Sequence, residues 1–464
     1  MIGNTPREHQ MSIFEVALES FIDMNHELVL LSHQIDWASV ESEFAEYYCA
    51  DNGRPSVPIR RMVGMMLLKS IYNLSDEGVV ARWTENPYMQ YFTGEKVFQK
   101  RPPMNPADFT KFRNRIGPGG AEKVFRISLM VNAEEITKKE MKSVMIDSTV
   151  QEKNITFPTD AKLYRKIIER VLKIAVREGI TLRRTYRREV KALKLKVRFM
   201  NHPTRKKEGK KEGKKAVKRL RTIARAMVND MARKMEGSRQ ACYRKEVEIF
   251  LRVIKQERSD KDKVYSLHEP QVECISKGKD HKKYEFGNKS GIAKTGGGLI
   301  VSALAFDGNP YDGHTLEAHL EQIERLTGHV PAEAVTDRGY RGKRHVGDTA
   351  ISIPASGSRG QSYYQKRKAR KKFCKRAGIE PVIGHLKADH RMIRNFLRGT
   401  RGDAINTMMA AAAYNMRHWM NKHAASPASS FVSWLRMLVR CLENVIFENE
   451  HQFICRRSVL AMVP

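Results

Sequence analysis

The 464-residue chain lacks long apolar runs and paired cysteines. Its longest apolar runs, residues 299–306 and 408–413, fall well short of the roughly 18 residues that a membrane span needs. None of the six cysteines forms a Cys-x-x-Cys pair, which argues against a zinc ribbon, a disulfide scaffold and a thioredoxin-type site. The first residues carry no basic-then-apolar signal sequence. We therefore expect a cytoplasmic protein with no membrane partner.

Acidic residues are scarce relative to basic ones. Lys and Arg number 84 and Asp and Glu 52, so the net charge is +32. Residues 161–240 hold 28 basic against 7 acidic residues, a net of +21, and residues 366–376 hold eight basic residues in eleven. A solvated charge run is one interpretation of these segments. Their local concentration favours the other, a surface that follows nucleic-acid phosphates, because each neutralised phosphate releases counterions.

The first 135 residues predict an all-helical domain. Residues 11–18 have apolar positions at helical spacing, Asp36 is a helix cap, and Pro58 opens a long apolar helix. A further helix at 74–84 ends before an Asn-Pro pair. Short helices joined by tight turns suit a DNA-binding module or a plain helical bundle, and spacing does not separate the two.

From residue 143 the pattern predicts a compact α/β core with a helical insertion. Residues 144–146 predict a short buried strand that ends at Asp147. Residues 160–255 predict a long basic helical hairpin, including 193–199, which alternate as a strand would but have helical neighbours on both sides. The remaining predicted elements are paired strands at 284–286 and 299–306, a helix at 315–326, strands at 332–336 and 350–353, a basic helical stretch at 364–397, and closing helices at 403–421 and 429–447.

Two acids follow predicted strands of this core. Asp147 and Asp337 each end a short apolar strand, and open α/β sheets bind ligands at that edge. A buried unpaired carboxylate is costly, so a cation is its natural partner, and oxygen ligands suit Mg²⁺ or Mn²⁺. Either acid alone is more simply an ordinary turn residue. Two in one core of a basic protein favour a metal site.

Glu380 adds a third acid between cations. On a continuous helix, Phe373, Arg376, Glu380 and Lys387 share one stripe, so one carboxylate lies between two cations. Pro381 cannot donate to the carbonyl of residue 377, so a kink or a new helix is expected there.

These residues resemble the three acids of the DD(E) insertion-sequence transposases. Asp147 stands in Ile-Asp-Ser-Thr and Asp337 in Thr-Asp-Arg-Gly-Tyr-Arg-Gly. The third block of that group, Tyr-x2-Arg-x3-Glu-x6-Lys, is similar to residues 373–387, with Phe in place of Tyr. Residues 72–77, 85–92, 150–159 and 283–287 are similar to members of the IS-five-type group.

The resemblance implies an α/β fold with a ribonuclease-H-like mixed-sheet core. A helical N-terminal domain at 1–135 would bind DNA ends or oligomerise. The catalytic domain at 140–400 would be interrupted by the basic helical insertion at 160–255, and C-terminal helices would occupy 401–464. The three acids would hold two Mg²⁺ ions, with Mn²⁺ as substitute, for strand cleavage and then strand transfer by the freed 3′-hydroxyl.

The partners implied are the terminal inverted repeats and target DNA, with a homo-oligomer, a dimer on DNA, associated with a bacterial nucleoid. The residues expected to bind DNA are Arg376, Lys387, Arg183, Arg184, Arg187, Arg188, Lys371 and Lys372. His314, His268 and Glu285 receive no role. Two alternatives stay open: a metal-dependent nuclease without strand transfer, and an inactive remnant that still binds DNA.

Overall fold

The computed structural model describes residues 16–49, 53, 55–200, 202, 207–276, 283–354 and 362–423. The chain forms two compact units. One comprises Met1–Gly64, Val80–Met104 and Met416–Pro464, and the other Met65–Val79 and Asn105–Asn415. The closing helix expected at 429–447 and most of the one at 11–18 lie outside the described residues.

The N-terminal part is helical, as predicted. Its helices are α1 (Glu27–Gln34), α2 (Trp37–Ala45), α3 (Ile59–Ile71), α4 (Asp76–Glu85), α5 (Pro87–Phe92) and α6 (Ala107–Val131), with short 3-10 turns η1 (Leu18–Ser20) and η2 (Ala133–Glu135). The Asp36 carboxylate accepts from the Ser39 N–H at 3.1 Å, so this residue caps α2 as expected. Asn86 caps α5 in the same way, and Pro87 is the first residue of that helix.

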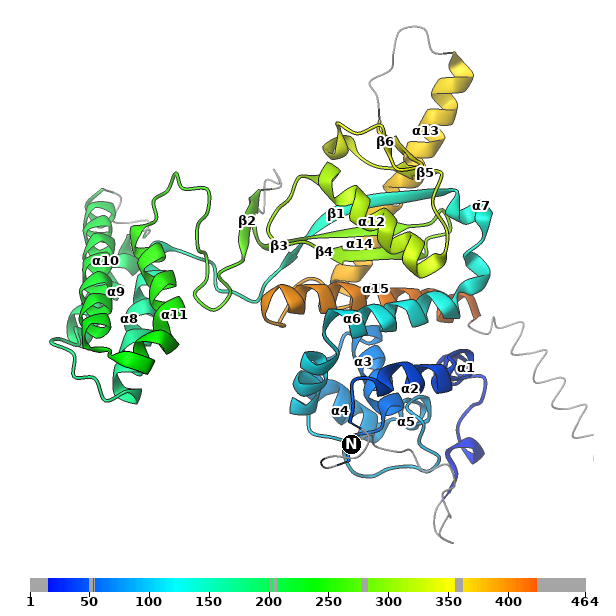
Figure 1. Ribbon diagram of the computed structural model, residues 1–464, viewed down its shortest axis with the longest axis horizontal. Helices are drawn as coiled ribbons and strands as arrows, with labels where there is room; N and C mark the ends of the chain where they lie inside the picture. The colour runs from blue at the N-terminus through cyan, green and yellow to red at the C-terminus, as the bar shows by residue number, and fades with distance from the viewer. Residues whose placement is uncertain are drawn as a thin grey trace, which may run out of the picture. The chain divides into compact units, whose positions relative to one another are not determined.

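The larger unit is built on a mixed sheet (Figure 1). The strands are β1 (Ser143–Glu152), β2 (Glu273–Ser276), β3 (Tyr284–Lys294), β4 (Ile300–Ala305), β5 (Glu333–Val335), β6 (His345–Val346) and β7 (Thr349–Ser352). Their order is β2-β3-β1-β5-β7-β6, with β4 also paired to β3. β3 pairs antiparallel with both β1 and β4. β5 pairs parallel with β1, and β7 pairs parallel with β5. This order fits the ribonuclease-H-like core expected from the sequence.

Helices cover both faces of the sheet. On one face, His319 of α12 (Asp312–Thr327) lies against Gly291, the partner of Ser148 in β1. Side chains of β1 alternate between faces, so Met145 and Asp147 lie on the other. There Met145 and Val335 pack with Ile379, the first residue of α14 (Ile379–Ala388), and with α13 (Tyr363–Ala377). Helix α15 (Gly399–His423) meets the same face, where its Thr407 bonds to Gln151 and Ser290.

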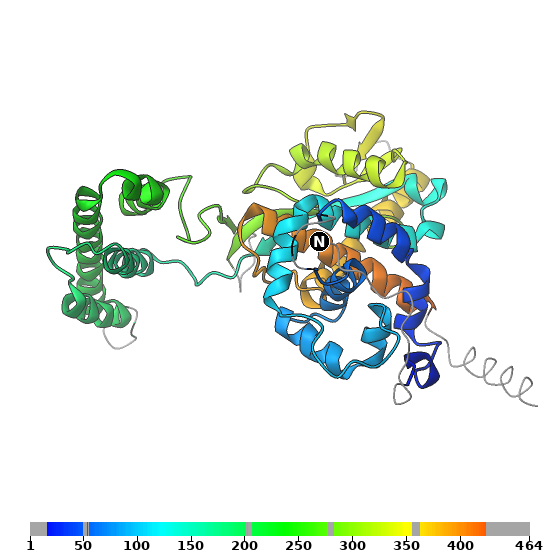
Figure 2. The same cartoon turned by 60° about the horizontal axis from the view of Figure 1, so that its bottom comes forward.

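The inserted segment forms a helical subdomain of its own. It contains α8 (Asp160–Arg177), α9 (Arg187–Phe199), α10 (Glu208–Lys234) and α11 (Gly237–Lys255), which Figures 1 and 2 show grouped together. An apolar stripe of α10, from Leu220 to Met231, is buried in a shared hydrophobic core. The expectation of a hairpin was therefore wrong in extent, because four helices rather than two enclose this core. Residues 193–199 are helical, as predicted.

Two other expectations need correction. Strand β1 does not end at Asp147 but continues to Glu152, because residues 148–152 pair with β3 as far as Gly287. The helical stretch expected at 364–397 breaks at Gly378 and ends at Ala388. Pro381 therefore lies in the first turn of a new helix, where its missing N–H costs no hydrogen bond.

Candidate active site

Parallel pairing of β1 and β5 brings Asp147 and Asp337 together. Met145 pairs with Val335, and each aspartate follows its strand partner by two residues. Neighbouring strands are about 4.8 Å apart, so the two carboxylates emerge side by side on one face. Asp337 also opens the short turn η3 (Arg338–Tyr340), accepting from the Gly339 N–H at 2.8 Å. The Asp147 carboxylate accepts from the neighbouring Ser148 N–H at 2.8 Å.

The third acid and a key arginine come from the α13–α14 junction. Arg376 lies in the last turn of α13 and Glu380 in the first turn of α14. Ile379, between them, is fully buried against Met145 and Val335. This apolar contact fixes the junction beside the strand positions that precede the two aspartates.

One guanidinium joins the three acids. Arg376 Nη2 lies 2.7 Å from Asp147 Oδ2 and 3.7 Å from Asp337 Oδ2, and its Nη1 lies 3.8 Å from Glu380 Oε1. Asp147 and Arg376 side chains are 13% and 16% exposed, while Glu380 is 69% exposed. The structure therefore brings Asp147, Asp337, Glu380 and Arg376 close together. Arg376, however, contacts the acids themselves.

The charge and the donors of this cluster suit a divalent cation. Three carboxylates share one guanidinium, which leaves a net charge of −2. The N–H of the buried Arg376 Nε finds no acceptor among the described residues, so this donor is available to an anion. Carboxylate oxygens are the ligands that Mg²⁺ and Mn²⁺ prefer. Within the described part of the chain, no three Asp, Glu, His or Cys side chains already lie at metal-ligand spacing. Arg376 is the group that the three acids share.

Two further residues of the site escaped the sequence analysis. Burial raises the pKa of the Tyr340 hydroxyl well above its ordinary value, and Asp312, Asp147 and Asp337 add to the rise. Asp312 begins α12 and pairs with Lys289 at 3.0 Å. The sequence signal that could have identified Asp312 is an acid at the start of a helix that follows a core strand. His314, two residues further along α12, lies edge-on to Tyr311.

A buried lysine also lies near the α13–α14 junction. Lys294 pairs with Met145 in the β1–β3 ladder and is 5% exposed. Its Nζ lies 3.5 Å from where a Cβ on Gly378 would stand, and burial lowers the pKa of this amine. Lys294 thus stands close to the helix ends that carry Arg376 and Glu380.

The other basic residues expected at DNA are dispersed. Lys387 is half-buried on α14, about two turns beyond Glu380. On α13, Lys371 is exposed, but Lys372 forms an ion pair with Glu333 and bonds to Ser352. The four arginines of the insert that were expected to bind DNA are exposed, and two of them are helical as expected. Arg187 and Arg188 begin α9, whereas Arg183 and Arg184 precede it, because the backbone turns through a left-handed Tyr186.

Comparisons with known proteins identify the family. Residues 16–115 match the family described as Transposase domain (DUF772), and residues 263–416 match the one described as Transposase DDE domain. The chain belongs to the DDE transposases. Asp337 and Glu380 lie within the second match, and Asp147 precedes it. Transposases of this family act with divalent metal ions, and the family confirms the ribonuclease-H-like α/β fold.

A curated relative shares part of the transposase. Uncharacterized protein ORF8 in the nfe locus of Rhizobium meliloti is 36% identical over 204 residues, which is 44% of this chain and 98% of the relative. No solved structure matches the chain. Among the described residues, no helix is long and apolar enough to cross a membrane.

Proposed function

We propose that this transposase binds the ends of an insertion sequence, cleaves the DNA strand there and joins it to a target. The observation that carries the proposal is the convergence of Asp147, Asp337 and Glu380 on one guanidinium. The acids come from three separate segments, and a structural ion pair needs only one of them. Their arrangement instead suits a site for two Mg²⁺ or Mn²⁺ ions next to a phosphodiester.

Each residue has a task in this proposal. Asp147, Asp337 and Glu380 would hold the cations, which would stabilise the charge on the reacting phosphate as Lewis acids. Arg376 offsets one of the three negative charges at rest, and it would bind a phosphate that reacts there as a planar fork. The reaction needs no nucleophilic side chain, because water and then a 3′-hydroxyl attack phosphorus.

Alanine variants of the acids test the proposal. The substrate is a labelled duplex from the DNA that flanks the reading frame, with a supercoiled plasmid as target. Asp147→Ala, Asp337→Ala and Glu380→Ala should each abolish cleavage and joining while the duplex still binds. Glu321→Ala, at an exposed acid of α12, is the matched control and should retain activity.

The products separate the alternatives. Joined plasmid products support strand transfer, whereas cleavage without joining indicates a nuclease. Binding without cleavage by the unaltered protein would indicate an inactive remnant. Wild-type-like cleavage by one of the three variants would remove that residue from the proposed site.

A further inference from the structure

The larger unit contains a basic pocket that none of the expected DNA-binding residues line. Its volume is about 810 Å³, and it lies between residues 69–77, the start of α6 and residues 391–405. Five cationic side chains line it: Lys69, Arg113, Arg391, Arg398 and Arg401. Asp76 and Glu77 are the acids of its wall. The pocket therefore has a net charge of +3.

The wall neutralises only part of this charge. Arg113 donates two hydrogen bonds to the Asp76 carboxylate, of 3.0 and 2.7 Å, and the Lys69 ammonium forms an ion pair with the same carboxylate at 2.6 Å. Asp76 is thus fully engaged. Arg398 and Arg401 are exposed and make no hydrogen bond or ion pair with any residue of the described ranges. Two guanidinium groups therefore face the pocket with no acceptor in the described part of the chain.

The pKa of Lys69, whose amine lies in the pocket wall, reflects the positive charge nearby. Burial, helped by the nearby Arg113 and Arg391, lowers the pKa of Lys69 to about 8 against the opposing effect of Asp76. Arg391 has a left-handed backbone, with φ of +64°, and donates to the Asn73 carbonyl at 3.2 Å. An arginine held in a sparsely populated conformation costs free energy, and such strain is concentrated at functional sites.

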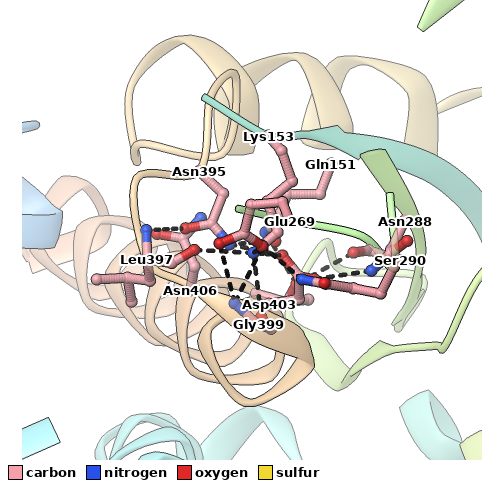
Figure 3. Close-up of polar contacts among 12 residues, drawn as sticks. Gln151, Lys153, Glu269, Asn288, Ser290, Asn395, Leu397, Gly399, Asp403 and Asn406 are labelled. Carbon is pink, nitrogen blue, oxygen red and sulfur yellow. Dashed lines mark hydrogen bonds and ion pairs between the residues drawn. The ribbon is translucent and has the colours of Figure 1, made fainter. Parts of the chain in front are cut away.

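A buried polar network fixes the segment that carries these arginines (Figure 3). Asn395 donates to Gln151 at 3.0 Å and to Asp403 at 2.7 Å. Lys153, 1% exposed, contacts Asp403 at 2.9 Å and donates to the carbonyls of Leu397 and Gly399 at 2.8 and 3.0 Å. The arginines are therefore presented by a backbone anchored to the end of β1, and a ligand need not order it on binding.

A phosphate group is the ligand that fits these features. Arginine forks match the geometry of phosphate oxygens, and the pocket wall offers two forks without acceptors. Helix α14 runs from the acids toward the pocket: its ten residues, Ile379–Ala388, span about 15 Å and end three residues before the pocket-lining Arg391. That distance is about four base-pair steps of duplex DNA at 3.4 Å each.

We propose that this pocket binds a backbone phosphate of duplex DNA a few base pairs from the reacting phosphodiester. The proposal rests on the proposed function, because it takes DNA as the partner. It adds a contact that positions the duplex along α14. The matched family descriptions assign no such role to these residues.

Arg398→Gln combined with Arg401→Gln tests the pocket. Both side chains are exposed, so the fold should hold, whereas Arg391 also bonds to the backbone and is a less clean choice. The probe is the labelled flanking duplex, with its Kd measured across a salt series. We expect affinity to fall about tenfold or more, since the double variant loses charge-assisted hydrogen bonds to the phosphate. The log–log salt slope should fall by about 0.9 per lost phosphate contact.

Arg394→Gln is the matched control. Arg394 is exposed on the same segment, makes no hydrogen bond or ion pair with the described residues, and does not line the pocket. Its loss should leave affinity and salt slope near the wild-type values. Duplexes with single uncharged methylphosphonates then locate the contact. Wild-type protein should lose affinity at one phosphate, and the double variant should no longer respond there.

The proposal is overturned if the double variant keeps the wild-type salt slope, or if Arg394→Gln weakens binding equally. It is also overturned if the methylphosphonate and the double variant weaken binding independently. In all these cases the unaltered protein can still cleave DNA, so the proposed function survives. Failure of wild-type protein to bind the duplex at all would overturn both.

Discussion

The buried Lys153 is the most informative residue to perturb in the anchoring network. Lys153→Met keeps the length of the side chain but removes its charge and its donors. In the structure the ammonium lies 2.9 Å from Asp403 Oδ1 and 3.4 Å from Glu269 Oε2, and both acids are almost fully buried. The substitution therefore leaves two buried carboxylates without their cation.

The expected cost follows from this geometry. Removing one member of a buried ion pair costs about 3–5 kcal/mol, because the remaining charge stays desolvated. Burial already raises the pKa of Asp403 despite the opposing effect of Lys153. Without Lys153 that pKa should rise further, so the folded variant binds a proton that the unfolded chain releases. The variant's deficit should therefore shrink as the pH falls toward the raised pKa.

Hydrogen exchange is the suitable assay, because a chain of two units need not unfold in one step. The amides of the β1 end and of the first turns of α15 should lose protection by about a hundredfold or more. Lys111→Met is the control, since its ion pair with Asp108 is exposed, and such pairs contribute about 0–1 kcal/mol. Protection within a few-fold of wild type at neutral pH would refute the assigned role of the Lys153 ion pair.

Three further predictions concern activity and binding. Cleavage should require Mg²⁺ or Mn²⁺, whereas Ca²⁺ should support binding better than chemistry, because it holds more ligands at longer distances; full turnover in EDTA would contradict the two-metal proposal. In the insert, a variant in which Gln replaces Arg183, Arg184, Arg187 and Arg188 should bind DNA more weakly, with a shallower salt slope and unchanged helicity by circular dichroism. An unaltered slope would place these four residues away from DNA. Duplex affinity should fall as the pH rises above 8, by up to about tenfold per unit, because a bound phosphate must restore the proton of Lys69. The charged groups that face Lys69 are Asp76, Arg113 and Arg391, and Lys69→Arg should flatten the pH profile; a persistent slope would exclude Lys69 as its source.

The sequence was sufficient where local signals decide the structure. Asp36 and Pro58 mark helix starts by their own chemistry, and the Asn-Pro pair at 86–87 marks the end of the helix before it. The three acids were found through the spacing and residues that resemble the transposase motifs. Their convergence follows from the fold, and the structure shows it.

Long-range pairing limited the rest. The extent of β1 beyond Asp147 depends on pairing with β3, about 140 residues away, and its polar Ser148 and Thr149 gave no strand signal. The pairing of Met145 with Val335 cannot be read from either segment alone. The basic pocket combines residues from three distant segments, so no local motif announces it. Its arginines also look like ordinary surface charge until their lack of partners is known.

The register of β3 has a consequence for how the basic insert evolves. Glu152, at the end of β1, and Glu273, at the start of β2, both pair with Gly287, one from each side. The chain thus leaves and re-enters the sheet at the same level, two strand spacings or about 10 Å apart. A short loop can span that gap, and the insert has a hydrophobic core of its own. Natural variants can therefore lengthen, shorten or recharge this subdomain while the strands that carry Asp147 and Asp337 keep their register.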